Sequence, residues 1–123
     1  MTKEQRFQII QKITELEGFR SINSIINSIV RDELMYAGIR AKKYGTNVEE
    51  EFHKVLDTYN FDGYEPSASI LSYIKHFSMY PELAAMQHVD LNDSVSYIGE
   101  YYDGTPTAMY RKKGRYEVEP IKL

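Results

Sequence analysis

Apolar residues recur at steps of three and four over most of the first 92 positions, a spacing that gathers side chains on one face of an α-helix. The expected fourth helix is an example, because Ile70, Leu71, Ile74 and Phe77 form its apolar stripe. The pattern predicts four to five helices in a helical body that spans residues 1–92. They are expected over residues 2–17, 21–44, 48–59, 67–77 and 81–86.

Residues typical of helix ends stand where these helices should begin and stop. Thr2 and Gln5 have the spacing of a capping box, and Thr46 and Glu49 repeat it before the third helix. Gly18 follows the first helix, as expected for a residue that adopts the left-handed conformation at little cost. The first and third helices are therefore predicted to begin at local capping motifs.

The second helix is the longest, at more than 20 residues, and its first half is rich in isoleucine. Gly38 interrupts its interior, where glycine costs about 1 kcal/mol relative to alanine. A helix this long in a short chain is either the central helix of the fold or part of a dimer interface. The predicted dimer contacts are Ile22, Ile25, Ile26 and Ile29.

The pattern changes after residue 93 to runs of β-branched and aromatic residues over 94–102, 107–112 and 115–119. Asp103-Gly104 and Lys113-Gly114 separate the runs as turn signals. Pro106 lacks an amide hydrogen, so the middle strand is expected to start after it. These features predict an antiparallel meander of three strands.

Two-residue turns would set the register of this meander. Ile98, Met109 and Val118 would then share one face of the sheet, while Tyr97 and Tyr110 would meet on the other. The expected fold is therefore α+β, with helices followed by a small antiparallel meander. We expect one domain of residues 1–123, divided into the helical body of 1–92 and a β-hairpin segment of 93–123.

Composition narrows the possible chemistry. The 123 residues include no cysteine, which excludes disulfides, thiolate nucleophiles and zinc–thiolate sites. No apolar run approaches the roughly 20 residues that a membrane-spanning helix needs. The net charge of −3 is too small to predict a general DNA-binding protein. A cytoplasmic location without membrane attachment is the expectation.

The candidate catalytic and metal-binding residues are few. Glu49 and His53 stand four residues apart on one helix face, and His88 and Asp90 are two apart in an extended segment. Neither pair reaches the three or four ligands of a usual metal site. Glu49 and His53 are equally typical of a surface ion pair, and His88 of a surface histidine at a helix end. No phosphate-binding glycine loop or nucleophile elbow is present. We expect no cofactor, no metal and no enzymatic activity, and a metal-dependent enzyme is the third hypothesis.

Basic residues crowd the predicted hairpin 110–116, and tyrosines flank them. Fixed positive charge attracts phosphates or acidic protein surfaces. The alternative is a purely structural role, in which lysines on an edge strand prevent aggregation. The chain has 11 tyrosines, a residue type enriched at protein interfaces. The predicted partner-binding or nucleic-acid-binding residues are Tyr97, Tyr110, Arg111, Lys112, Lys113, Arg115 and Tyr116.

The leading hypothesis is a small interaction protein, acting as a homodimer, that binds and modulates or inhibits another protein. Abundant Ile, Lys, Asn and Tyr are typical of AT-rich bacterial and phage genomes. We therefore expect a phage or mobile-element accessory protein, with antagonism of host defence as one role. The alternative is a protein that binds nucleic acid or a small nucleotide through hairpin 110–116.

Overall fold

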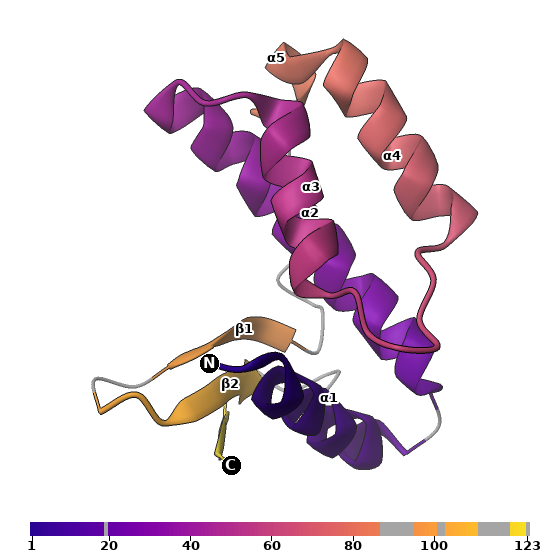
Figure 1. The fold of residues 1–123 in the computed structure, drawn as a ribbon, viewed down its shortest axis with the longest axis vertical. Coiled ribbons are helices and arrows are strands. Elements are labelled where there is room, and N and C mark those ends of the chain that lie inside the picture. Colours follow the sequence, from indigo (N-terminus) through magenta and orange to yellow (C-terminus); the bar gives the residue numbers. More distant parts are fainter. Residues whose placement is uncertain (19, 87–94, 101–102, 111–118, 123) are drawn as a thin grey trace. The chain divides into compact units, whose positions relative to one another are not determined.

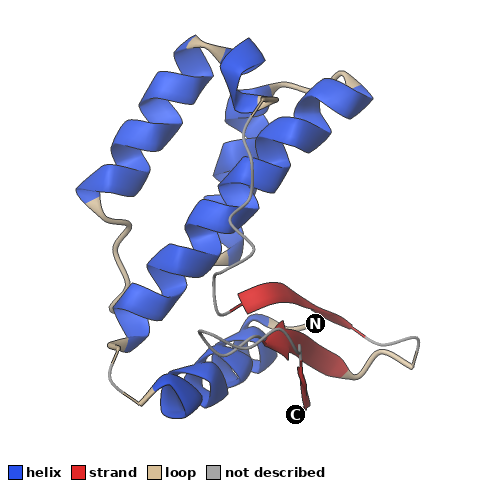
Figure 2. Cartoon of the chain, turned by 180° about the vertical axis from the view of Figure 1, so that it is seen from behind, coloured by secondary structure: helices blue, strands red, loops and turns tan. Residues whose placement is uncertain are grey.

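The computed structural model describes residues 1–18, 20–86, 95–100, 103–110 and 119–122, and these form helices followed by a small antiparallel sheet (Figures 1 and 2). This confirms the predicted α+β fold with a C-terminal meander. The helices are α1 (Lys3–Glu17), α2 (Ile22–Tyr44), α3 (Val48–Thr58), α4 (Ala68–Met79) and α5 (Pro81–Ala84). The strands are β1 (Val95–Glu100), β2 (Pro106–Tyr110) and β3 (Glu119–Lys122), in the order β1-β2-β3.

The chain divides into two compact units. The first combines Met1–Ile26 with Asp90–Leu123, and the second is Asn27–Val89. Thus α1 groups with the strands, whereas the sequence suggested a division near residue 92. The single-domain organisation stays a prediction. In the part of the chain that the structure describes, no helix is long and apolar enough to span a bilayer.

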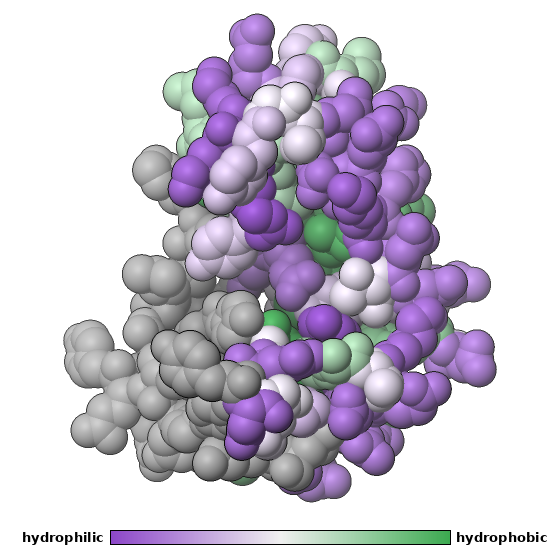
Figure 3. Space-filling view, turned by 60° about the vertical axis from the view of Figure 1, so that its left-hand side comes forward, coloured by the Kyte–Doolittle hydropathy of each residue, from purple (hydrophilic) through white to green (hydrophobic). Residues whose placement is uncertain are grey.

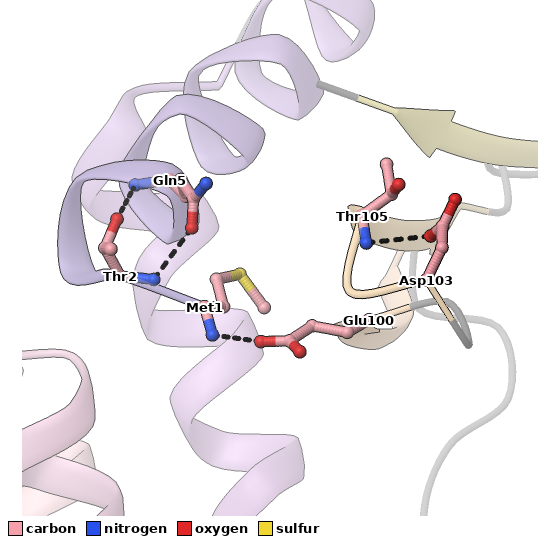
Figure 4. Close-up of polar contacts among 6 residues, drawn as sticks. All are labelled: Met1, Thr2, Gln5, Glu100, Asp103 and Thr105. Carbon is pink, nitrogen blue, oxygen red and sulfur yellow. Dashed lines mark hydrogen bonds and ion pairs between the residues drawn. The ribbon is translucent and has the colours of Figure 1, made fainter.

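Local capping explains where α1 and α3 begin. The Thr2 hydroxyl accepts a hydrogen bond from the Gln5 amide at 3.1 Å, and the Gln5 side-chain oxygen accepts one from the Thr2 amide at 2.9 Å (Figure 4). This is the predicted capping box, and Gly18 ends α1 with a φ of 76°. At α3 the prediction was wrong by one residue, because Asn47 rather than Thr46 is the N-cap and accepts from the amide of Glu50.

In the first unit, α1 packs against β2 and β3. Ile9, Ile10 and Ile13 of α1 are fully buried, as is Ala108 at the centre of the sheet. Ile98 of β1, directly opposite Ala108, is also buried. The Met1 amino group contacts the Glu100 carboxylate at the end of β1 (Figure 4). Apolar residues of α1 and the strands therefore form the core of this unit.

The register of β1 and β2 differs from the prediction by one residue. Ile98 lies opposite Ala108 instead of Met109, and Tyr97 lies opposite Met109. Tyr97 and Tyr110 are therefore not directly paired, because Tyr110 is opposite Val95. The expected alignment with Val118 concerns a position outside the described residues.

A longer connection causes this shift. Residues 101–105 join β1 to β2, in place of a two-residue turn, and Glu100 pairs with Pro106. Pro106 is itself the first residue of β2, a position that needs no ladder amide and therefore accepts proline. Gly104 does adopt the left-handed conformation expected of the turn, with a φ of 83°. The structure describes the third strand over Glu119–Lys122, and positions 115–118 of the predicted strand lie outside the described residues.

In the second unit, α4 packs against α3 and α5. Hydrogen bonds tie α3 and the following loop to α2. The hydroxyl of Tyr59, a fully buried residue, donates to the Glu33 carboxylate at 2.6 Å, and the Tyr64 hydroxyl donates to the Asn27 side-chain oxygen at 2.7 Å. Polar contacts as well as apolar burial therefore hold the end of α3 and the following loop against α2.

A close contact with α5 explains why α2 has glycine at position 38, and the sequence did not reveal this contact. A Cβ atom at this position would lie 2.9 Å from the Cβ of Ala84 and 3.0 Å from the Ala84 carbonyl oxygen. Ala84 of α5 is fully buried. The missing side chain thus allows the backbone of α5 to approach α2 closely, which offsets the helix-forming cost of glycine.

Candidate interaction surface

The predicted basic hairpin lies largely outside the described residues. Tyr97 is within β1 and Tyr110 ends β2, so the structure places their backbones in adjacent strands. The partner-binding role of the hairpin stays a prediction. The residues outside the described part are Arg111, Lys112, Lys113, Arg115 and Tyr116.

The predicted dimer contacts on α2 are mainly buried within the chain. Ile25 and Ile26 are each 1% exposed and Ile29 is 3% exposed, while Ile22 is partly exposed. Burial of three of these side chains is a sufficient reason for the isoleucine-rich stripe, since apolar burial is the main stabilising term in folding. The homodimer itself stays a prediction.

The described histidines do not form a metal site. The imidazole of His53 lies 3.8 Å from the Glu49 carboxylate in an exposed i,i+4 pair, and His76 packs against the rings of Phe77 and Tyr80. Among the described residues, no group of three or more ligating side chains could hold a metal ion. His88 lies outside those residues. The Glu49 and His53 side chains are thus exposed neighbours on one face of α3, as their spacing predicts.

Large apolar side chains are exposed where α4 turns into α5. We name this surface the α4–α5 corner and define it by Met79, Tyr80, Leu83 and Met86, which are 64%, 50%, 44% and 71% exposed. Four exposed large apolar residues within eight positions form a concentration that folding does not require. The other exposed large apolar residues of the described chain are Leu16, Tyr36, Tyr44 and Leu71.

Backbone geometry creates the corner. Helix α4 ends at Met79, and Tyr80 leaves the helical conformation with φ −126° and ψ 66° while its amide still donates to the His76 carbonyl. Pro81 then begins α5, where its missing amide hydrogen costs nothing. Because Ala84 is held against Gly38, the short α5 is anchored on one side and leaves Leu83 half exposed on another.

Aromatic rings support the corner from α4. The ring of Tyr80 lies 5.2 Å from that of His76, which in turn lies 4.8 Å from Phe77. Phe77 is 4.5 Å from Tyr73, and Tyr73 reaches Phe52 of α3 at 5.9 Å. The exposed Tyr80 therefore continues a row of packed rings that extends to the buried Phe52, and this packing restricts the orientations open to it.

Polar and charged side chains border the corner. Helix α4 carries exposed Lys75 and His76 but no acidic residue, and α5 contributes one carboxylate, Glu82. Burial raises the pKa of the nearby Tyr73 from 10.0 to about 12, which makes its hydroxyl harder to ionise. The corner is thus an apolar centre with lysine and histidine on its α4 side.

Sequence reasoning did not identify this surface. The apolar stripe of the fourth helix predicted burial of Ile70, Leu71, Ile74 and Phe77, yet Leu71 is 52% exposed. Met79 lies off that stripe, and apolar residues off a helical stripe are the signal that would have drawn attention to the corner.

Hydrophilic residues dominate the coloured atoms on the face of the molecule drawn in Figure 3, where hydrophobic residues form small separate patches. Such scattered apolar residues are normal for a protein surface, so the grouping at the corner is the exception that calls for an explanation. Comparison of the chain with models of protein families, with curated proteins and with solved structures finds no match.

Proposed function

We propose that this chain is a protein-binding protein, and that the α4–α5 corner is its contact surface. The observation that carries the proposal is the exposure of Met79, Tyr80, Leu83 and Met86 within one eight-residue segment. Tyrosine and methionine are enriched at protein interfaces, and the flexible methionine side chain adapts to the shape of a partner. Inhibiting or modulating another protein, the role expected from the sequence, requires such binding.

The size of the corner supports this proposal. With about 200 Å² for a large side chain, the exposed parts of the four residues amount to roughly 450 Å², a patch size that is often functional. A standard interface buries about 800 Å² on each partner. The corner thus supplies the apolar centre, and the surrounding polar residues, Lys75 and Glu82 among them, supply the rim.

The test compares two variants of the full chain as baits in an extract of the source cells. Met79→Ser with Met86→Ser removes the two most exposed apolar side chains of the corner. Leu16→Ser is the matched control, because Leu16 is 52% exposed but belongs to α1. A captured protein is identified by mass spectrometry and purified, and its affinity for each variant is measured by calorimetry.

We expect the purified partner to bind the wild type and Leu16→Ser equally. The double variant should bind at least about tenfold more weakly, since burying a methionine side chain contributes about 1.5–3 kcal/mol and both side chains are mostly exposed beforehand. Equal affinity of the double variant, or capture of nothing beyond the background of an unrelated bait, would contradict the proposal.

A further inference from the structure

Tyrosines and cations share one exposed face in the C-terminal half of α2 (Figure 1). We name this surface the tyrosine–cation face and define it by Tyr36, Arg40, Lys43 and Tyr44, all of which are exposed. At 3.6 residues per turn, these positions lie within an arc of about 100° and extend over about 12 Å along the helix axis. Two aromatic rings and two positive charges are therefore presented together on one side of a single helix.

The positive charge in this half of α2 is not neutralised by side chains of the described chain. Residues 34–48 contain no acidic residue and three cations, which are Arg40, Lys42 and Lys43. Among the described residues, none of these three side chains has a hydrogen bond or an ion pair. At the start of α3, Glu51 instead accepts a hydrogen bond from Lys54 of its own helix at 3.1 Å. The tyrosine–cation face therefore keeps charge that an anionic ligand can complement.

Helix electrostatics account for only part of this arrangement. Cations in the last turn complement the negative C-terminal end of a helix, which is a sufficient reason for Lys42 and Lys43. That effect requires no aromatic residue, yet Tyr36 and Tyr44 are 38% and 67% exposed. The ammonium group of Lys43 lies 5.4 Å from the centre of the Tyr44 ring. An exposed ring and a cation thus stand side by side.

We propose that the tyrosine–cation face binds a short stretch of single-stranded nucleic acid, with bases stacked on the two tyrosines and phosphates beside Arg40 and Lys43. Rings beside cations suit this ligand, because every unpaired base offers a face for stacking and every nucleotide carries a phosphate. Tyrosine and arginine are also common at protein interfaces, but lysine is depleted there, which favours phosphate over an acidic protein. This activity goes beyond the proposed protein binding and uses a different surface.

The test follows the binding of a fluorescent oligothymidine strand to the full chain by anisotropy. A strand of about 12 nucleotides is within the usual site sizes of single-strand-binding surfaces. Binding is measured from low to physiological salt, because the net charge of −3 opposes long-range attraction of the strand. Arg40→Gln with Lys43→Gln removes the two charges, and Tyr36→Leu with Tyr44→Leu removes the rings but keeps apolar side chains.

The two variants should weaken binding in different ways. The charge variant should bind at least about tenfold more weakly at low salt, and the slope of log affinity against log salt should fall by about 1.4, since each phosphate contact contributes about 0.7. The ring variant should bind about tenfold more weakly with an unchanged slope. Lys75→Gln with Tyr80→Leu is the matched control, because it replaces an exposed lysine and an exposed tyrosine elsewhere and should leave binding unchanged.

Three outcomes overturn this inference. They are no binding of the strand by the wild type at low salt, equal weakening in the control and in the face variants, and displacement of the strand by polyglutamate as effectively as by unlabelled strand. The last result would assign the face to acidic proteins. Met79→Ser with Met86→Ser should bind the strand normally, so failure of this inference and failure of the proposed function are recognised independently.

Discussion

Replacement of Gly38 by alanine tests the close packing of α5 against α2. Without tertiary contacts, this change in a helix interior should stabilise the protein by about 1 kcal/mol, because alanine is the better helix former. In the folded chain, however, the new Cβ would lie 2.9 Å from the Ala84 Cβ, 3.0 Å from its carbonyl oxygen and 3.2 Å from its carbonyl carbon. Two of these three atoms belong to the backbone, so no side-chain rotation relieves the overlap.

The steric cost should exceed the gain in helix propensity. Overpacking a buried contact typically costs about 1–3 kcal/mol, and Ala84 is fully buried. We therefore expect Gly38→Ala to lower the free energy of unfolding by about 1 kcal/mol, or the melting temperature by roughly 4 °C. Gly38→Val adds two more methyl groups without the propensity advantage of alanine and should cost about 3 kcal/mol or more.

The assay is equilibrium unfolding in urea, followed by circular dichroism, with the slope against denaturant checked for constancy. Ser72→Ala is the control, because Ser72 is exposed within α4 and its replacement changes helix propensity alone. A Gly38→Ala protein that is more stable than the wild type by about 1 kcal/mol would refute the reasoning. The approach of α5 to α2 would then not depend on the missing side chain.

Three further predictions concern buried hydroxyls and the first helix cap. Tyr59→Phe should lower the free energy of unfolding by about 1.5–3 kcal/mol, because it leaves the Glu33 carboxylate without this donor. Tyr73→Phe should be neutral or stabilising, because the buried Tyr73 hydroxyl has no hydrogen-bond partner among the described residues, and equal losses of stability in urea unfolding would contradict this. Burial raises the pKa of Tyr73 from 10.0 to about 12, so the folded state resists ionisation of its hydroxyl. The wild type should therefore lose stability between pH 10 and about 12 relative to Tyr73→Phe, and parallel curves of stability against pH would refute the raised pKa. Thr2→Ala should cost about 1 kcal/mol and Thr2→Ser much less, since serine keeps the acceptor for the Gln5 amide; similar unfolding midpoints for both variants would speak against the cap.

The features that the sequence predicted well are those that depend on local interactions. The capping box of Thr2 and Gln5 and the stop at Gly18 involve residues that are close in the chain. The buried stripe of α2 follows from helical periodicity, and Leu34 and Ala37 are fully buried as that pattern indicates. Local spacing therefore carries enough information for the class of fold and for most helix ends.

Features that depend on tertiary geometry were missed. The strand register shifted by one residue because residues 101–105 form a longer connection than the Asp103-Gly104 signal suggested. The role of Gly38 depends on Ala84, which is 46 positions away in the sequence, and no local pattern indicates that contact.

The α4–α5 corner was missed for a related reason. Helical periodicity shows that a helix has an apolar face, but it does not show whether another element covers the residues beside that face. Leu71 shows this directly, because it belongs to the predicted stripe and is 52% exposed. The binding surface expected at 110–116 rested on charge and tyrosine content, which the described residues do not test.

The most direct test of the central claim is to label the methionine methyl groups with carbon-13 and record their resonances while the purified partner is added. The chain has five methionines, so each signal can be assigned by substitution. Our account predicts that the Met79 and Met86 signals shift or broaden on binding, while that of Met35 in α2, which is mostly covered by the chain, stays in place. Unchanged Met79 and Met86 signals in a saturated complex would contradict the claim that the α4–α5 corner is the contact surface.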